Sequence, residues 1–254
     1  MEDFKDFNKE LLYFLNEQLK IYGGYAFTEK EEVYVLALKS IINDIQKMAS
    51  KIVVMTAKCK VEFPNGWDHA YDNQDVTLIT ISNADPIYAT IKAEMDKVQA
   101  RIIQIHRIQA MTLWRRYYYE RLRVSEINNG NPNELLLIHG TRGTPPEVIY
   151  NGKEGFDMMF AHIGGTRGGG IYFAPYSSYS CNGYEYRLPN NQSQVFFAKV
   201  TLGTVAEDVD ANRLMPPVKP GTNMRYDSVR NGPTMYIVYS NSKAYPMYLV
   251  TYTK

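Results

Sequence analysis

The chain has 254 residues, enough for one large domain or for one domain with a small extension. Its 28 Lys and Arg residues nearly balance 27 Asp and Glu residues, which excludes an overall charge of the kind that attracts nucleic acids or acidic membranes. Two cysteines cannot by themselves build a disulfide framework or a four-ligand zinc site, and no metal is expected. The polar start and the lack of an apolar run of about 18 residues predict a soluble intracellular protein, cytoplasmic or nuclear.

The first 62 residues predict a helical extension. An apolar pattern at helical spacing runs from Phe4 to Leu15 and stops at glycines 23 and 24. A second helix is expected after Thr28 and Glu31, a capping-box pair, with an apolar face made by Val33, Leu36, Ile41, Ile45 and Met48. The turn-rich residues 63–67 end this segment, so the sequence predicts an extension over 1–62 and a second domain over 63–254.

The second domain is expected to combine helices with many short strands. Helical patterns cover residues 87–98, behind the favourable start Asp85-Pro86, and 113–124. β-rich runs, separated by Gly, Pro and Asn, occupy residues 76–81, 102–108, 135–138, 170–173, 195–202, 235–239 and 248–252. Because the order lacks the alternation of a doubly wound sheet, an α+β fold is predicted.

Two strand ends carry the most informative side chains. His139-Gly140-Thr141 follows an apolar strand and offers an imidazole donor beside a backbone that a ligand can approach closely, because glycine has no Cβ. Tyr172, in the middle of a later strand, offers a flat ring for stacking on a heterocycle. Together the two segments indicate a site for NAD.

Residues 63–252 resemble the catalytic domain of the poly(ADP-ribose) polymerase superfamily, and especially its mono-ADP-ribosylating branch. The resemblance rests on the order of many motifs rather than on any single one. They are Phe63-Pro64 and Trp67, Ile105 with Arg107-Ile108-Gln109, Leu113-Trp114 and Tyr117, Asn133-Glu134, Ile138-His139-Gly140-Thr141, Gly155-Phe156-Asp157, Gly168 and Gly170 to Ala174, Tyr179-Ser180, Pro216-Pro217, Tyr226 to Val229, and Ala244 to Leu249. Residues 1–62 lie outside the match.

The resemblance implies a fold of two packed, mainly antiparallel sheets around an NAD cleft, and a role for each motif. His139 would bond the adenosine-side ribose with Thr141 beside it, and the Gly140 backbone would pair with the nicotinamide carboxamide. Tyr172 would stack at the nicotinamide end, and the Ser180 hydroxyl would reach the carboxamide oxygen. A second stacking tyrosine is expected at Tyr184, with Tyr186 as the alternative, and residues 157–167 correspond to a loop over the donor.

Met235 departs from the polymerising members of the family. The third signature position of those members holds a glutamate that activates the acceptor for chain growth. Methionine is a weak hydrogen-bond acceptor and cannot act as a base, so the signature here reads His139, Tyr172 and Met235. The resemblance therefore implies transfer of one ADP-ribose from NAD to a protein side chain, on acceptor proteins or on the chain itself, with release of nicotinamide.

Two alternatives stay open at the level of sequence. The chain could be a catalytically silent module that binds NAD or another ligand, since Met235 removes the glutamate. The same fold could also modify nucleic-acid ends if the basic pair Arg115-Arg116 proved continuous with the cleft.

Overall fold

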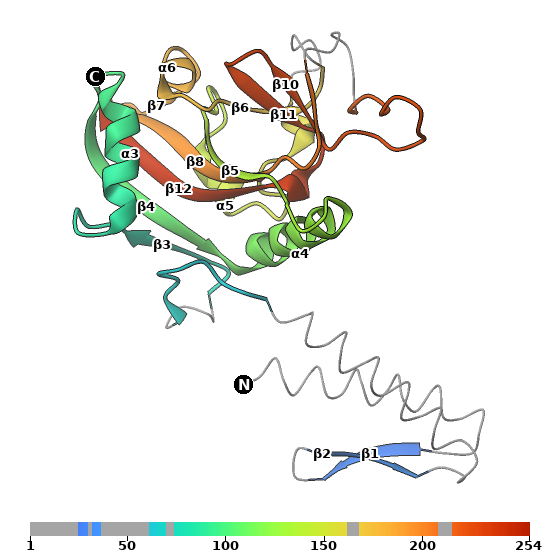
Figure 1. Cartoon of the computed structure of the whole chain (residues 1–254). Coiled ribbons are helices and arrows are strands. Elements are labelled where there is room, and N and C mark those ends of the chain that lie inside the picture. Colours follow the sequence, from blue (N-terminus) through green and yellow to red (C-terminus); the bar gives the residue numbers. More distant parts are fainter. Residues whose placement is uncertain (1–24, 30–31, 37–60, 70–73, 162–167, 208–214) are drawn as a thin grey trace. The chain divides into compact units, whose positions relative to one another are not determined.

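The computed structural model describes residues 25–29, 32–36, 61–69, 74–161, 168–207 and 215–254. The chain divides into two compact units, Met1–Val61 and Glu62–Lys254 (Figure 1).

The described part of the first unit is a β-hairpin. Strand β1 (Tyr25–Glu29) pairs antiparallel with β2 (Glu32–Leu36), and Glu29 lies opposite Glu32. The helix expected across Val33 and Leu36 is therefore wrong over these residues. Consecutive β-branched and aromatic side chains, Val33 to Val35, favour a strand more strongly than the capping-box pair favours a helix. The other helical patterns of residues 1–62 lie outside the described residues.

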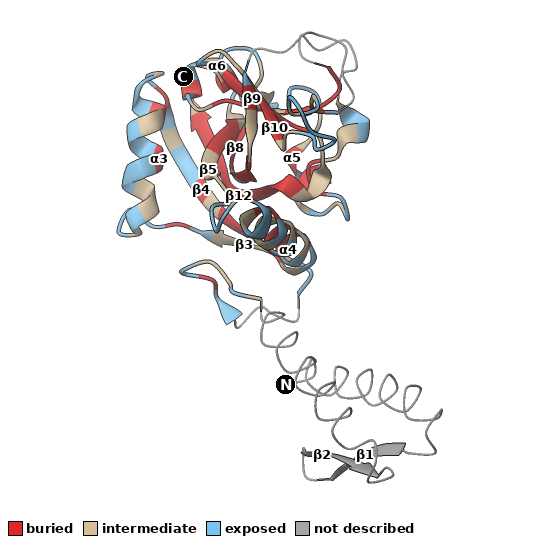
Figure 2. Ribbon diagram, turned by 45° about the vertical axis from the view of Figure 1, so that its right-hand side comes forward, coloured by how far each residue is buried: buried red, intermediate tan, exposed pale blue. Residues whose placement is uncertain are grey.

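The second unit is built on a large antiparallel sheet with the order β3-β4-β12-β8-β5, and a short β7 pairs with β8. Its strands are β3 (Val76–Thr80), β4 (Arg101–Ala110), β5 (Glu134–His139), β7 (Tyr186–Arg187), β8 (Ser193–Thr201) and β12 (Ala244–Thr253). Strand β12 pairs on both sides, and every residue of it but Thr253 is buried (Figure 2). It forms the centre of the core.

A smaller four-stranded sheet has the order β6-β11-β10-β9. Its strands are β6 (Ile171–Phe173), β9 (Val205–Glu207), β10 (Ser228–Asn231) and β11 (Met235–Val238). Only the β9–β10 pair is parallel. The predicted α+β fold with two mainly antiparallel sheets is confirmed.

Helices and 3-10 turns complete the second unit, and the helices pack against strands of the large sheet (Figure 1). They are α3 (Pro86–Asp96), α4 (Met111–Ile127), α5 (Pro146–Tyr150), α6 (Ser177–Ser180) and the 3-10 turns η4 (Met158–Phe160) and η5 (Asn241–Lys243). The Asp85 side chain caps α3 by accepting from the Ile87 amide at 3.1 Å, and Pro86 occupies the first turn, as the sequence predicted. Helix α4, expected over residues 113–124, has one apolar face, made by the buried residues Leu113, Trp114, Tyr117, Tyr118 and Val124.

Candidate functional site

The two sheets join where β5 ends. Ile138, the residue before the end of β5, forms an isolated antiparallel bridge with Ala174, directly after β6. Both backbone hydrogen bonds of this bridge are 2.8 Å long. The bridge places His139 beside Tyr172, although the two residues belong to different sheets.

The His139 ring is held by the strand it faces. Its Nδ1 lies 2.7 Å from the Tyr172 carbonyl oxygen, and its ring packs against Phe156 and Phe173 at 5.1 and 5.3 Å between centroids. A carbonyl can only accept, so Nδ1 carries the proton. Burial lowers the pKa of His139 below its ordinary value, although the hydrogen bond to Tyr172 opposes the shift. Neutral His139 therefore presents Nε2 as an acceptor, where the sequence led us to expect a donor.

Gly140 lies so close to the backbone of Tyr184 that a side chain would not fit. A Cβ at this position would lie 2.2 Å from the Tyr184 carbonyl oxygen and 2.5 Å from its carbonyl carbon. The Tyr184 carbonyl also accepts from the Arg142 amide at 2.9 Å. The segment around Tyr184 is thus pressed against the end of β5, and only glycine permits that distance.

Ser180 lies at the site because hydrogen bonds hold α6 against α3 and β5. The Ser177 hydroxyl donates to the Glu94 carbonyl of α3 at 2.7 Å, and the Ser177 amide donates to the Glu94 carboxylate at 2.8 Å. At the other end of α6, the Ser180 hydroxyl donates to the Ile138 carbonyl at 3.1 Å. This orientation leaves the lone pairs of the Ser180 oxygen for a ligand donor.

Two tyrosines form a stacked pair. The Tyr179 and Tyr184 rings lie 5.0 Å apart at 11°, and their hydroxyls are 3.4 Å apart. Burial and the hydrogen bond to Tyr184 raise the pKa of Tyr179 to about 12. The Arg142 guanidinium lies 4.5 Å from the Tyr184 ring centroid. Because a third ring cannot fit between stacked rings at this spacing, an aromatic ligand would have to use an outer face of the pair.

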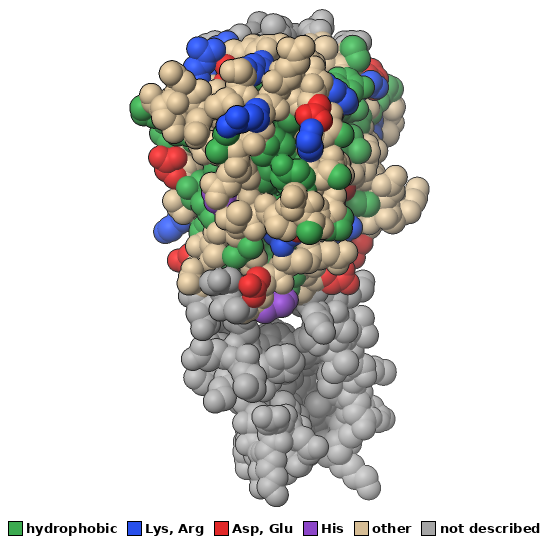
Figure 3. Space-filling model, turned by 90° about the vertical axis from the view of Figure 1, so that its left-hand side faces the viewer, with side chains coloured by type: hydrophobic (Ala, Val, Ile, Leu, Met, Phe, Trp, Pro, Cys, Tyr) green, Lys and Arg blue, Asp and Glu red, His purple; other side chains and the backbone are tan. Residues whose placement is uncertain are grey.

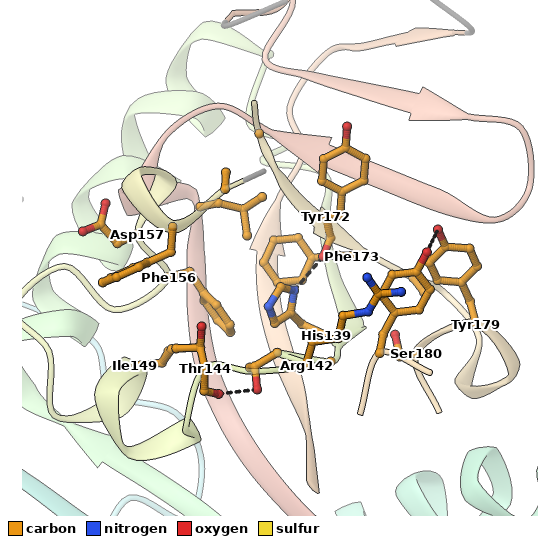
Figure 4. A pocket seen from close by; sticks show the side chains of 18 residues that line it. His139, Arg142, Thr144, Ile149, Phe156, Asp157, Tyr172, Phe173, Tyr179 and Ser180 are labelled. Atoms are coloured by element: carbon orange, nitrogen blue, oxygen red, sulfur yellow. Dashed lines mark hydrogen bonds between the residues drawn. The ribbon is translucent and has the colours of Figure 1, made fainter. Parts of the chain in front are cut away.

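These side chains line a cavity of about 570 Å³, a volume typical of small-molecule sites. Thr144, Ile149, Phe156 and Asp157 lie on one side of His139, and Arg142, Tyr179 and Ser180 lie on the other (Figure 4). Six residues that the sequence singled out are brought together here: His139, Gly140, Thr141, Tyr172, Ser180 and Tyr184. Among the described residues that line the cavity, Arg142 is the one permanently charged cation.

Two other predicted residues lie elsewhere. Met235 does not line the cavity; it is buried in an apolar cluster with Ala206, Val229 and Ile237, against which Tyr172 packs. Tyr186, the alternative to Tyr184, belongs to β7 and does not line the cavity either. Of the expected donor loop over 157–167, residues 162–167 lie outside the described residues.

Sequence reasoning missed Arg142, Phe156 and Tyr179 as lining residues. Arg142 directly follows the His-Gly-Thr motif and Tyr179 directly precedes Ser180, so proximity to known motifs was the available signal. Phe156 was quoted only as a motif residue. Its ring contacts Phe173 and Phe196 as well as His139, and no local pattern predicts that set.

Comparison with known proteins decides the family. Residues 84–215 match the model of the poly(ADP-ribose) polymerase catalytic domain. A probable poly(ADP-ribose) polymerase of Dictyostelium discoideum is 33% identical over 75% of the chain. The chain belongs to the poly(ADP-ribose) polymerase catalytic-domain family. The predicted resemblance is confirmed.

Other relatives are named as mono-transferases. Human protein mono-ADP-ribosyltransferase PARP14 is 29% identical over 87% of the chain, and mouse protein mono-ADP-ribosyltransferase PARP12 is 27% identical over 90%. The chain spans 57% of the Dictyostelium relative, 12% of the human one and 33% of the mouse one. It thus corresponds to one part of longer proteins.

No described helix is long and apolar enough to cross a membrane. No group of three or more described His, Cys, Asp or Glu residues is placed to hold a metal ion.

Proposed function

We propose that this protein transfers a single ADP-ribose unit from NAD to protein side chains and releases nicotinamide. The observation that carries the proposal is the cavity that combines His139, Gly140, Tyr172, Ser180 and Tyr184, while an apolar Met235 takes the third signature position. Membership of the family and the relatives named as mono-transferases support the same activity.

The cavity suits NAD as the donor substrate. The Nε2 atom of neutral His139 accepts from a ribose hydroxyl. The Gly140 backbone and the Ser180 oxygen serve the carboxamide, and the Tyr172 and Tyr184 rings supply flat surfaces for the heterocycle. The Arg142 guanidinium has no carboxylate partner among the described residues, so it can pair with an anionic group of the dinucleotide.

The reaction needs little general acid or base catalysis from these residues. Nicotinamide leaves NAD as a neutral molecule from a cationic linkage, so its departure needs no proton. The protein contributes by holding the donor in one bent geometry and by stabilising the oxocarbenium-like state. The acceptor side chain then attacks the exposed ribose carbon C1′ and forms the new glycosidic bond.

Met235 explains why transfer stops at one unit. The Met235 side chain is 6% exposed, and its thioether can neither deprotonate an acceptor hydroxyl nor bond it strongly. A carboxylate acceptor brings its own negative charge and needs no base. A ribose hydroxyl, the acceptor during chain growth, does need one.

Modification of nucleic-acid ends receives less support. The Arg116 guanidinium is already bound to the Lys153 carbonyl and, at 2.8 Å, to the Glu154 carboxylate. On the face shown in Figure 3, the described Lys and Arg side chains are scattered, with carboxylates among them, around an apolar centre. Neither the surroundings of Arg116 nor the face in Figure 3 offers a continuous row of cations that could bind a phosphate backbone.

The test uses the full chain with labelled NAD and candidate acceptor proteins, scored on gels. The proposal predicts a discrete label on the chain or an acceptor, lost in His139→Ala and Tyr172→Ala. Thermal unfolding of each variant is recorded so that loss of fold is separated from loss of activity. These variants also control for nonenzymatic glycation.

Three outcomes would contradict the proposal in different ways. A long ladder of products would mean that Met235 does not prevent chain growth. Thermal stabilisation by NAD without any label would favour a silent binding module. Labelling of RNA with none of protein would favour the nucleic-acid reading.

A further inference from the structure

A second cavity, of about 320 Å³, shares no lining residue with the first. It is formed by the C-terminal part of α4, by η5 and by the loop 215–227 between β9 and β10. This loop projects at the right of Figure 1. The cavity plays no part in the proposed transfer chemistry.

The loop is held in one shape by its own backbone. Val218 and Arg225 form an antiparallel bridge, and the Lys219 amide donates to the Met224 carbonyl at 2.7 Å. The Tyr226 amide donates to the Pro217 carbonyl at 3.0 Å. These contacts hold the backbone of the loop in a defined conformation.

The carboxylates of Glu120 and Asp227, the latter part of the cavity lining, are already paired with cations. Lys243, whose side chain is 8% exposed, lies 3.3 Å from the Glu120 carboxylate and 3.1 Å from the Asp227 carboxylate. Arg123 also pairs with Glu120, at 2.8 Å. Burial alone would raise the pKa of Glu120, but its bond to Arg123 and the charge of Lys243 hold that pKa below its usual range. Both carboxylates are thus ionised and paired.

Two cations of the lining have no such partner. The Arg225 guanidinium donates to the Pro216 carbonyl at 2.7 Å, and the Lys219 ammonium lies 5.8 Å from the Tyr226 ring centroid. No carboxylate among the described residues pairs with either side chain. Within the described part of the chain, the cavity therefore carries uncompensated positive charge.

Apolar side chains surround these cations. Ile127 is 48% exposed and Met224 is 52% exposed, and both line the cavity. Met215 and Val218 of the same loop are 50% and 46% exposed. A cluster of large exposed apolar side chains is typical of a protein-binding surface.

We propose that the second cavity, hereafter the groove, binds an acidic peptide segment with apolar side chains from a partner protein. The residues that would contact the peptide are Ile127, Lys219, Met224 and Arg225. Lys219 and Arg225 would pair with its carboxylates, while Ile127 and Met224 would cover its apolar groups. A small anion would leave the apolar side chains uncovered. Peptide binding at this site would not require the proposed transfer activity.

The position of the groove links it to the first cavity. Tyr226 and Tyr239 line the groove and pack against the buried cluster that contains Met235. Tyr172 and Tyr179, which line the first cavity, pack against the same cluster. Both cavities therefore have lining residues that contact the Met235 cluster.

The test measures the fluorescence anisotropy of a short labelled peptide of alternating Glu and Leu residues, titrated with the full chain. A Lys–Leu peptide serves as the control. We expect selective binding of the acidic peptide that weakens steeply between about 0.05 and 0.5 M salt, because screening acts on exposed charges. The double variant Lys219→Glu/Arg225→Glu should weaken binding by about tenfold or more.

Two further variants test whether the peptide binds in the groove. Arg101→Glu reverses an exposed cation on β4, away from the groove lining, and should leave the affinity unchanged. Met224→Ser should weaken binding severalfold without changing its salt dependence. Equal binding of both peptides, binding of neither, or an unaffected double variant would overturn the proposal. So would a single-stranded RNA that bound more tightly and displaced the peptide.

Discussion

Met235 is a buried side chain at a position where polymerising relatives are expected to carry an acid. Its neighbours Ala206, Val229 and Ile237 are apolar, so a carboxylate there would have little to replace its hydration. We predict that Met235→Glu lowers the free energy of unfolding at pH 7 by about 2–4 kcal/mol. Burial would raise the pKa of the new carboxyl, so the loss should shrink as the pH falls toward about 4, where the unfolded chain is protonated too.

Urea unfolding at several pH values measures this effect. Met235→Leu is the matched control and should cost less than about 1.5 kcal/mol, because it nearly conserves volume. A Met235→Glu variant as stable as the native chain at pH 7 would show that the carboxylate finds a polar partner.

Gly140 offers a second test at the residue scale. Since a Cβ would meet the Tyr184 carbonyl at 2.2 Å, Gly140→Ala must push the segment around Tyr184 away from β5. We expect a loss of about 1–3 kcal/mol in stability and weaker stabilisation by NAD. Gly143→Ala is the control, because no atom lies within 4 Å of its Cβ position. Thermal melts with and without NAD distinguish the two, and identical melts would contradict the close approach.

At the scale of elements, α4 anchors the second unit through Trp114. The indole is 4% exposed, packs edge-on against Tyr245 at 5.0 Å and donates to the Glu62 carbonyl at 2.9 Å. Trp114→Ala should cost about 3–5 kcal/mol, and Trp114→Phe should lose mainly the hydrogen bond, about 1 kcal/mol. Thr112→Ala, on the exposed side of α4, is the control. Equal stability of the Ala and Phe variants in urea would mean that the ring packing contributes little.

At the scale of the whole molecule, the second unit contains the large sheet, the smaller four-stranded sheet and every described residue that lines the first cavity. We predict that a fragment of residues 62–254 folds alone, melts in one transition within a few degrees of the full chain, and is stabilised equally by NAD. The fragment must begin no later than Glu62, which accepts from Trp114. Calorimetry of both chains checks this, and an unfolded or aggregated fragment would make the first unit part of the fold.

Elements with strong local patterns could be predicted from the sequence. The long strands β4, β8 and β12 and the helices α3 and α4 were predicted because each carries its own periodicity or cap. The motif residues of the first cavity were predicted for a similar reason, since they follow one another in a family-specific order. The short elements β9, β10, α5 and α6 were missed because each is too short to show a period.

The chemistry open to these residues depends on contacts that form when the chain folds. The bridge between Ile138 and Ala174 sets His139 against the Tyr172 carbonyl, and that contact decides which ring nitrogen carries the proton. Packing of the smaller sheet buries Met235 beside the cleft rather than in it. The peptide groove is likewise assembled from α4 and a loop far along the chain. Such contacts join residues distant in sequence, so no local pattern encodes them.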